Sequence, residues 1–338
     1  RPFCNASEAQ RVASESGLDL SAAEGLSDPQ GTCEIIAFAE NSRINVSKPL
    51  SYTGSEAQNI VAYQVFAQTG GCQIPNPYQA RFDQTDPDGE YTSNLDIISA
   101  LIDWWDYDTE RSSFDPGRGQ VVVGGGEDDV YQSFDDPYRP RNAPFDSIEE
   151  LRLVRGIGDD FWSTFIEPDP NDPRSRLVTI YGSGAVNPNE APPEVLLARV
   201  CSILQSTTLC TDPMEAAKFV QFLTTVRMLA PIPFFSTADD FINFLQSPAD
   251  IHPILRQILG ANNPLLFTPI TVAGAQRSEL QRLLVTGARI ITVDVTGTAG
   301  RATTRIRTIM NFHEPWTPAP PNAGTMPPLG IYLYYRIE

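Results

Sequence analysis

Acidic side chains crowd two short stretches of the sequence, and their chemistry is that of a cation site. One stretch, DWWDYD, covers residues 103–108, and the other, EDD, covers residues 127–129. Carboxylates this close together repel one another unless a cation or water separates them. Oxygen ligands of this kind suit calcium, which takes roughly 6–8 of them. The predicted calcium ligands are Asp106, Asp108, Glu127, Asp128 and Asp129.

Asp103 precedes Asp106 by three residues, so both side chains lie on one face of the helix that this segment predicts. Asp103 is therefore either a further ligand or simply a polar helix position. The glycines at 124–126 let the chain turn sharply and present carbonyl oxygens, which calcium also accepts. The spacing lacks the 12-residue loop of an EF-hand, with its glycine at position six and glutamate at position twelve.

Two other acidic segments compete with this site. They are QTDPDGE at 84–90 and EPDPNDPRS at 167–175. Asp-Gly and Asp-Pro sequences are typical of turns, so turns are favoured over metal sites in both. The acidic or amide residues concerned are Asp86, Asp88, Glu90, Asp169, Asn171 and Asp172.

No motif for covalent chemistry is recognisable. The two histidines, His252 and His313, are far apart in the sequence, and neither lies in an H-E-x-x-H zinc motif. There is no G-x-S-x-G, Walker loop or C-x-x-C sequence. Paired carboxylates can cleave glycosides, but Trp104 and Trp105 belong to an amphipathic helix pattern and are expected in the core. The sequence predicts a protein that is not an enzyme.

Composition narrows the class further. The 338 residues carry 24 Lys and Arg against 42 Asp and Glu, a net charge of −18 that repels nucleic acid and anionic lipid at long range. Apolar residues make up 41% and charged residues 20%, which indicates a globular chain, not a disordered acidic tail. The length suggests about two domains.

Five cysteines point to an oxidising compartment. Cys201 and Cys210 flank a turn between two predicted helices and are expected to form a disulfide. Cys4 and Cys33 flank the N-terminal helical segment and could form a second, which leaves Cys72 over. Five unrelated buried thiols remain the alternative, because connectivity cannot be read from sequence alone.

Strand patterns at both ends of the chain enclose a long helical middle, which predicts an α+β fold with an inserted helical domain. A helix over 5–24 and a strand from 31 come first, and alternating strands return from 265 onward. The predicted domains are 1–48, 49–262 and 263–338, the first and last completing one sheet. Helices in between are predicted at 54–68, 93–106, 147–155, 159–166, 190–204, 213–229, 236–246 and 249–259.

Several motifs, in one order, resemble the minor pseudopilin K of bacterial type II secretion systems (general secretion pathway protein K). Each motif alone is weak, but their shared order is specific, and the similarity spans roughly residues 34–250. The motifs are SRINVSK at 42–48, DW-x-D-x-D at 103–108, G-E-D-x-x-Y at 126–131, PYRPRN at 137–142, S-x-E-E-L-x-x-V-x-G-I at 147–157 and GAVNPNEAPPEVL at 184–196.

This resemblance implies a pilin-like N-terminal helix on a small antiparallel sheet, with a large helical domain inserted. It implies calcium at the loop with the family's G-A-E motif, here Gly126-Glu127, with Gly in place of Ala. It implies assembly with minor pseudopilins I and J at the tip of a periplasmic pseudopilus, where cargo or the secretin could also bind. Residues 5–24 and 34–39 are the expected partner contacts. Family members carry an inner-membrane anchor helix, which this sequence lacks, so a periplasmic part beyond the anchor is expected.

Two alternatives remain open. LRLVRGIG at 151–158 resembles the hairpin of helix-hairpin-helix DNA-binding domains, but Glu149, Glu150, Asp159 and Asp160 surround it. Since nucleic-acid binding depends on Lys and Arg releasing counterions, a packing role is favoured. The other alternative is a calcium-binding adhesive protein at the tip of a type IV pilus-like filament.

Overall fold

The computed structural model divides the chain into two compact units. The sheet unit comprises Arg1–Glu40 and Ala288–Glu338, and the helical unit comprises Asn41–Gly287. The helical unit therefore begins eight residues before and ends twenty-five residues after the insert bounds predicted from the sequence. The structure describes residues 31–47, 54–71, 92–127, 131–133, 136–170, 172–229, 233–250, 266–312 and 331–337.

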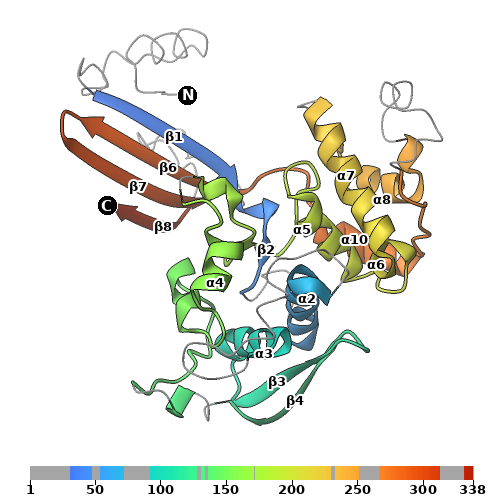
Figure 1. Ribbon diagram of the computed structural model, residues 1–338, viewed down its shortest axis with the longest axis horizontal. Coiled ribbons are helices and arrows are strands. Elements are labelled where there is room, and N and C mark those ends of the chain that lie inside the picture. The colour runs from blue at the N-terminus through green and yellow to red at the C-terminus, as the bar shows by residue number, and fades with distance from the viewer. Residues whose placement is uncertain are drawn as a thin grey trace, which may run out of the picture. The chain divides into compact units, whose positions relative to one another are not determined.

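The sheet unit contains one antiparallel sheet in the order β1-β6-β7-β8 (Figure 1). Strand β1 pairs with β6 from Gly31↔Ala299 to Ala39↔Ile291, so the two ends of the chain share one sheet. The α+β class expected from the sequence is confirmed. The strands are β1 (Gly31–Ala39), β6 (Ile290–Ala299), β7 (Ala302–Asn311) and β8 (Ile331–Ile337).

A charged row crosses the middle of this sheet. Asp294 of β6 is buried and accepts hydrogen bonds from Arg305 and Arg307 of β7. Strands β6 and β7 form the expected hairpin, with Ala299 opposite Ala302 and Gly300 at φ +62° in the turn. Only glycine adopts that conformation without steric cost, which explains the T-A-G-R-A sequence of the turn.

The helical unit has its core between helices whose starts are set by capping residues. Ser93 and Asp96 form a capping box at the start of α3, and Thr237 and Asp240 form another at α8. Short strands β2 (Ile44–Asn45) and β5 (Val178–Thr179) pair in parallel. The helices are α2 (Gly54–Phe66), α3 (Asn94–Trp105), α4 (Asp159–Phe161), α5 (Pro193–Cys201), α6 (Thr208–Thr211), α7 (Pro213–Leu229), α8 (Ala238–Gln246) and α10 (Gly274–Leu283).

The strand predicted over 265–274 is wrong, because residues 266–273 have no regular secondary structure. Their backbone groups bond to helices: Thr268 N–H donates to the Glu215 carboxylate and Ile270 N–H to Leu245 O. Their apolar side chains, including Phe267, are buried in the helical core. The apolar alternation reflects this packing, and helix α10, which the sequence pattern did not reveal, follows directly.

Most predicted helices are found, with shifted ends. The segment 147–155 forms a 3-10 helix (Ile148–Leu153), and 190–204 shortens to α5. The predicted helices 5–24 and 249–259 lie outside the described residues, apart from a 3-10 turn at Pro248–Asp250. The chain also forms a hairpin that was not predicted, β3 (Glu110–Asp115) with β4 (Gln120–Gly126).

The Cys201–Cys210 disulfide is present, with a Cα–Cα distance of 5.5 Å, and this prediction is confirmed. Cys33 is also disulfide-bonded. Cys4 and Cys72 lie outside the described residues. Within the described ranges, no helix is both long and apolar enough to cross a membrane.

The glycine hairpin at 151–158 packs into the helical core. Leu151, Val154 and Ile157 are buried, and Gly156 has φ +78°. A Cβ at Gly156 would lie 2.5 Å from Thr92 Cγ2 and 2.7 Å from Ile97 Cγ1. The glycine is required by its backbone conformation and by this close packing, in keeping with the packing role expected for the motif.

Gly156→Ala should therefore destabilise the protein by about 2–4 kcal/mol, because strain in a left-handed conformation adds to overpacking. Gly158→Ala is the matched control, since Gly158 has φ −84° and nothing within 4 Å of an added Cβ. Urea unfolding measures both. Equal loss of stability in the two variants would contradict the packing role of Gly156.

Candidate metal centre

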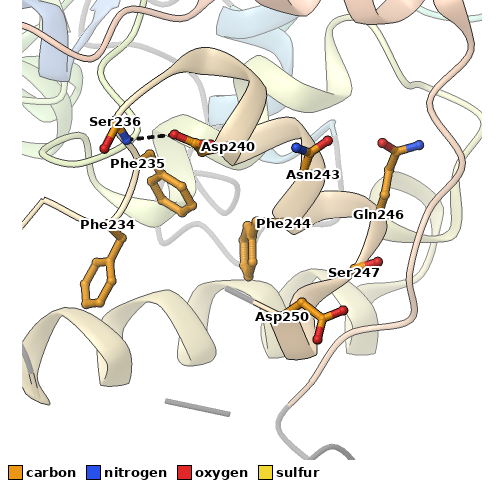
Figure 2. A pocket seen from close by; sticks show the side chains of 9 residues that line it. All are labelled: Phe234, Phe235, Ser236, Asp240, Asn243, Phe244, Gln246, Ser247 and Asp250. Carbon is orange, nitrogen blue, oxygen red and sulfur yellow. Dashed lines mark hydrogen bonds between the residues drawn. The ribbon is translucent and has the colours of Figure 1, made fainter. Parts of the chain in front are cut away.

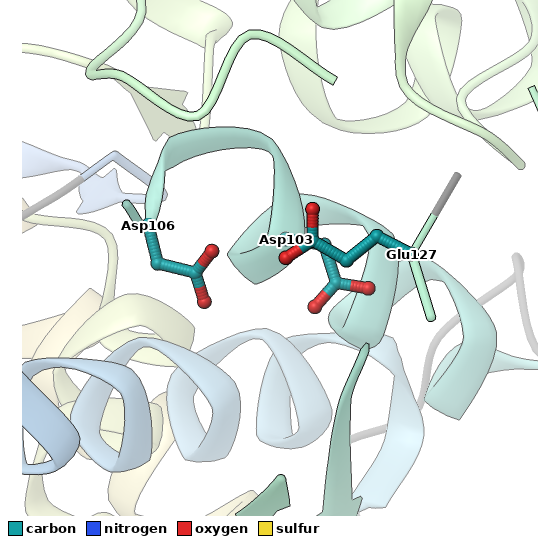
Figure 3. Close-up of side chains that lie close together, drawn as sticks. All are labelled: Asp103, Asp106 and Glu127. Atoms are coloured by element: carbon teal, nitrogen blue, oxygen red, sulfur yellow. The ribbon is translucent and has the colours of Figure 1, made fainter. Parts of the chain in front are cut away.

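Three buried carboxylates meet between α3 and the end of β4. Asp103, Asp106 and Glu127 are 5%, 6% and 5% exposed, and one oxygen from each lies within 4.8 Å of the others. Figure 3 shows the three side chains close together, with Asp103 in the last turn of α3 and Asp106 at its C-cap. Among the described residues this is the cluster of His, Cys, Asp and Glu side chains close enough to hold a metal ion.

Local sequence positions the two aspartates. The capping box at Ser93 and Asp96 fixes the start of α3, and the helix ends at Asp106, whose N–H bonds to Ile102 O. Residues three apart share a helix face. The structure places Asp103 with Asp106 and Glu127 in the cluster that could hold a metal ion.

A bulge in the β3–β4 hairpin brings Glu127 to the aspartates. Glu110 pairs with Gly126 and Ser112 with Val123, so β4 has one residue more than β3 between these pairs. Gly125 lies there with φ +95°, a conformation suited to glycine. The glycines before Glu127 thus redirect the strand.

Hydrogen bonds tie the two aspartates to their surroundings but leave one oxygen free. Asp103 Oδ1 accepts the Ser112 N–H at 2.7 Å. Asp106 Oδ2 accepts Gln58 Nε2 at 2.9 Å and the Ser112 hydroxyl at 3.3 Å. Asp106 Oδ1 is buried without a hydrogen-bond partner, which is costly for a carboxylate unless a cation binds it.

The raised pKa values of the two aspartates agree with the burial of their carboxylates. Burial raises the pKa of Asp103 to about 7; the Ser112 N–H opposes the rise, and the neighbouring charge of Asp106 adds to it. Burial likewise raises the pKa of Asp106 to about 6, with a further contribution from the charge of Asp108. Within the described ranges, neither carboxylate forms an ion pair with a Lys or Arg side chain.

The donor set fits calcium. Each ligand is a carboxylate, and neither histidine nor cysteine, which softer metals prefer, belongs to the cluster. Three carboxylates supply three to six oxygens, depending on whether each binds through one oxygen or two. Calcium requires roughly 6–8 oxygens, so water or carbonyl oxygens would complete the shell.

The structure places only some of the predicted ligands in the cluster. Asp106 and Glu127 belong to the cluster, whereas Asp108 is exposed and accepts the Glu110 N–H in a turn. Asp128 and Asp129 lie outside the described residues. Of the competing acidic segments, 84–90 also lies outside them. In 167–175, Asp172 caps a 3-10 turn and pairs with Arg174, which lowers the pKa of Asp172, so the turn interpretation holds there.

The basic side chains of the glycine hairpin have partners of their own. Arg152 pairs with Asp159 at 2.7 Å and lies over the Trp162 ring at 4.0 Å. Trp104 and Trp105 are each 2% exposed, so they lie in the core and offer no platform for a sugar. His252 and His313 lie outside the described residues.

Comparisons with known proteins agree with this architecture. Residues 89–165, which contain α3, the β3–β4 hairpin and the glycine hairpin, match the family model for type II secretion system protein K. A chain of the GspK-GspI-GspJ complex from the enterotoxigenic Escherichia coli type 2 secretion system has a similar fold, with a TM-score of 0.50 at 15% identity. The match covers 92% of this chain and 81% of that one. No curated protein sequence matches. The resemblance to protein K expected from the sequence is confirmed.

Asp103→Asn should stabilise the metal-free protein at high pH. Above pH 7 the buried Asp103 carboxylate is charged in both the folded and unfolded states, and only the folded state bears the desolvation cost. As the pH falls from 7 toward 4, only the folded state takes up the proton, so wild-type stability rises. Since asparagine never carries the charge, the variant should gain roughly 1–3 kcal/mol at pH 8, and this gain should shrink by pH 5.

Urea unfolding in excess chelator measures the difference, with Asp136→Asn as the control because Asp136 is exposed. A variant less stable than wild type at pH 8 would contradict the desolvation cost inferred for the buried Asp103 carboxylate.

Proposed function

We propose that this chain is the minor pseudopilin K of a type II secretion system, acting at the tip of the pseudopilus. The nested architecture carries the proposal: a small sheet made from both ends of the chain, interrupted by the helical unit Asn41–Gly287. Such a chain can assemble through its pilin-like part while its large insert prevents further subunits from adding above it. Its task would be steric and associative, with no catalytic step.

The sheet unit has a surface suited to assembly. Strand β8 is at the edge of the sheet and exposes Tyr332, Tyr335 and Ile337 to 62%, 57% and 59%. An exposed apolar edge strand is a liability in a protein that works alone and is typical of a strand that meets a partner. The similar structure is a complex with GspI and GspJ, and we assign minor pseudopilins I and J as partners of this chain. Cargo or the secretin would meet the helical unit.

Calcium is the metal we assign to Asp103, Asp106 and Glu127. It would offset three buried negative charges and join α3 to the end of the β3–β4 hairpin. Its role would be to stabilise the helical unit. The periplasm, which is oxidising, is the compartment we propose, because the Cys201–Cys210 disulfide persists there. A membrane anchor would precede the residues of this chain.

Calcium added to the chelator-treated protein should raise its melting temperature by roughly 5 °C or more at a hundredfold excess over Kd. Asp106→Asn should lose most of that shift. Asp108→Asn should keep it, because Asp108 lies outside the cluster and asparagine can still accept the Glu110 N–H. Calorimetric titration gives the affinity directly. If calcium produces no shift, or if both variants lose it equally, the assignment fails.

Coexpression with minor pseudopilins I and J should yield an equimolar complex on size exclusion, whereas an adhesive tip protein of a type IV pilus would not enter it. Tyr335→Glu, which places a charge on the exposed strand β8, should weaken assembly at least fivefold. Met228→Glu on α7, where Met228 is 81% exposed, is the control. The account is contradicted if no complex forms, or if Met228→Glu weakens it as much.

A further inference from the structure

Helix α2 supplies two polar side chains that hold the parts of the metal centre in place. The helix packs against α3 and against β4, the two elements that position the three carboxylates (Figure 1). Two consecutive residues of α2, Gln58 and Asn59, bond to one part each. Gln58 is buried, and Asn59 is half-buried. The two bonds join a third element of the helical unit to the metal centre.

Gln58 fixes the orientation of Asp106. Its side-chain nitrogen Nε2 donates to Asp106 Oδ2 at 2.9 Å. Because an ionised carboxylate only accepts hydrogen bonds, the amide of Gln58 must present its nitrogen here. With Oδ2 engaged, Asp106 Oδ1 is left for a cation, and this atom is buried without a hydrogen-bond partner. Donation to a carboxylate also favours its charged form, which is the form that binds a metal.

Ser112 links this bond to the second aspartate. Its N–H donates to Asp103 Oδ1 at 2.7 Å, and its hydroxyl donates to Asp106 Oδ2 at 3.3 Å, the oxygen that Gln58 also holds. Ser112 is fully buried. A frame of three hydrogen bonds therefore fixes both aspartates, and Gln58 is the member of that frame that comes from α2.

Asn59 fixes the strand that leads to Glu127. Its Oδ1 accepts the Val121 N–H at 2.6 Å. Val121 lies near the start of β4, and the strand ends at Gly126, next to Glu127. Because β4 has one neighbour in its two-stranded sheet, a side-chain bond from α2 helps to set where the hairpin lies against the helices.

Amide side chains on α8 show the opposite arrangement. Asn243 and Gln246, which line a pocket beside that helix (Figure 2), accept hydrogen bonds from the guanidinium of Arg277. Arg277 also pairs with an aspartate of α8, so the carboxylate there has a cation of the protein's own. Gln58 instead donates to Asp106, which pairs with no Lys or Arg in the part of the chain that the structure describes. The bond from α2 thus orients a carboxylate whose charge is still to be offset.

Ligands that are held in place beforehand bind more tightly, because less conformational entropy is lost on binding. Groups that hydrogen-bond to metal ligands typically change metal affinity by roughly 10–100-fold. On the assignment of calcium to the cluster, we propose that Gln58 and Asn59 are positioning residues of the calcium site. Gln58 turns Asp106 so that Oδ1 is left for the ion. Asn59 holds the strand that ends beside Glu127, and calcium thereby links α2 to α3 and to the hairpin.

Terbium luminescence with the full chain tests this. Terbium replaces calcium at oxygen ligands, and Trp104 and Trp105, which lie between the two aspartates in the sequence, sensitise its emission. Competition with calcium gives the calcium affinity, and lifetimes in H₂O and D₂O count the water molecules on the ion. Gln58→Met, which has a similar shape without the donor, should weaken calcium binding by roughly tenfold or more. The number of bound waters should rise, which a purely structural role would not cause.

Gln64→Met is the matched control. Gln64 lies on the same helix and is 1% exposed, and neither of its amide atoms has a hydrogen-bond partner within the described ranges. This variant should leave the calcium affinity and the water count unchanged. Asn59→Leu should weaken binding less than Gln58→Met, by roughly threefold, because its bond is further from the ligands. Asn59→Asp keeps an acceptor oxygen and should retain the affinity of the wild type.

Melting temperatures in chelator establish which variants fold. If the wild type binds neither terbium nor calcium, the calcium assignment fails, and the positioning role fails with it. If the wild type binds but Gln58→Met binds as tightly with the same water count, only the positioning role is overturned. The same holds if Gln64→Met weakens binding as much. Should Gln58→Met not fold, the Asn59 pair decides, and equal binding by Asn59→Leu and Asn59→Asp overturns the role.

Discussion

The pairing of β1 with β6 is the constraint on which the rest of this structure depends. It joins residues 31–39 to residues 291–299 in one antiparallel ladder and makes everything between them an insertion. The entropic cost of closing so long a loop is modest, since each doubling of loop length adds only about 0.6 kcal/mol. An insert that folds by itself brings its own ends into position and lowers that cost further. The chain thus keeps a small sheet for assembly and adds a large body to it.

Within the helical unit, the most consequential electrostatic feature is the burial of the two aspartate carboxylates of the metal cluster. Asp103 and Asp106 are held by Ser112 and Gln58 in a place where desolvation opposes their ionisation. Such groups weaken a fold that lacks a compensating cation. The acidic cluster is therefore best understood as a site whose stabilising effect depends on what binds there.

The sequence reveals local features well and tertiary ones poorly. Helical spacing places Asp103 beside Asp106, and the cap at Ser93 marks where α3 starts. Glu127 reaches them only through the bulge at Gly125, which requires a hairpin that no sequence pattern indicated. Asp108 is two residues from Asp106, yet α3 ends at Trp105, and Asp108 lies in the turn that follows, where it accepts the Glu110 N–H.

Residues 266–273 were mistaken for a strand for a related reason. Their alternation of apolar and polar side chains suits a strand, but partners on α7 and α8 decide their conformation. The conformation of the loop before α8 could not be predicted either, because Asn189 and Thr286, distant in sequence, hydrogen-bond to Phe235 and Ser236. The α+β class could be predicted from the sequence, because the segregation of strands and helices along the chain does not depend on tertiary contacts between distant residues.

Native-state hydrogen exchange of the full chain, read by mass spectrometry, tests the nested arrangement most directly when wild type is compared with Val293→Pro. Val293 is in the central strand β6, where a proline removes a ladder hydrogen bond. The account predicts that residues 31–39, 290–299 and 302–311 lose protection together, while α2, α3 and α7 keep theirs. Loss of protection in those helices at the same time, or an unprotected β1 in the wild type, would contradict it.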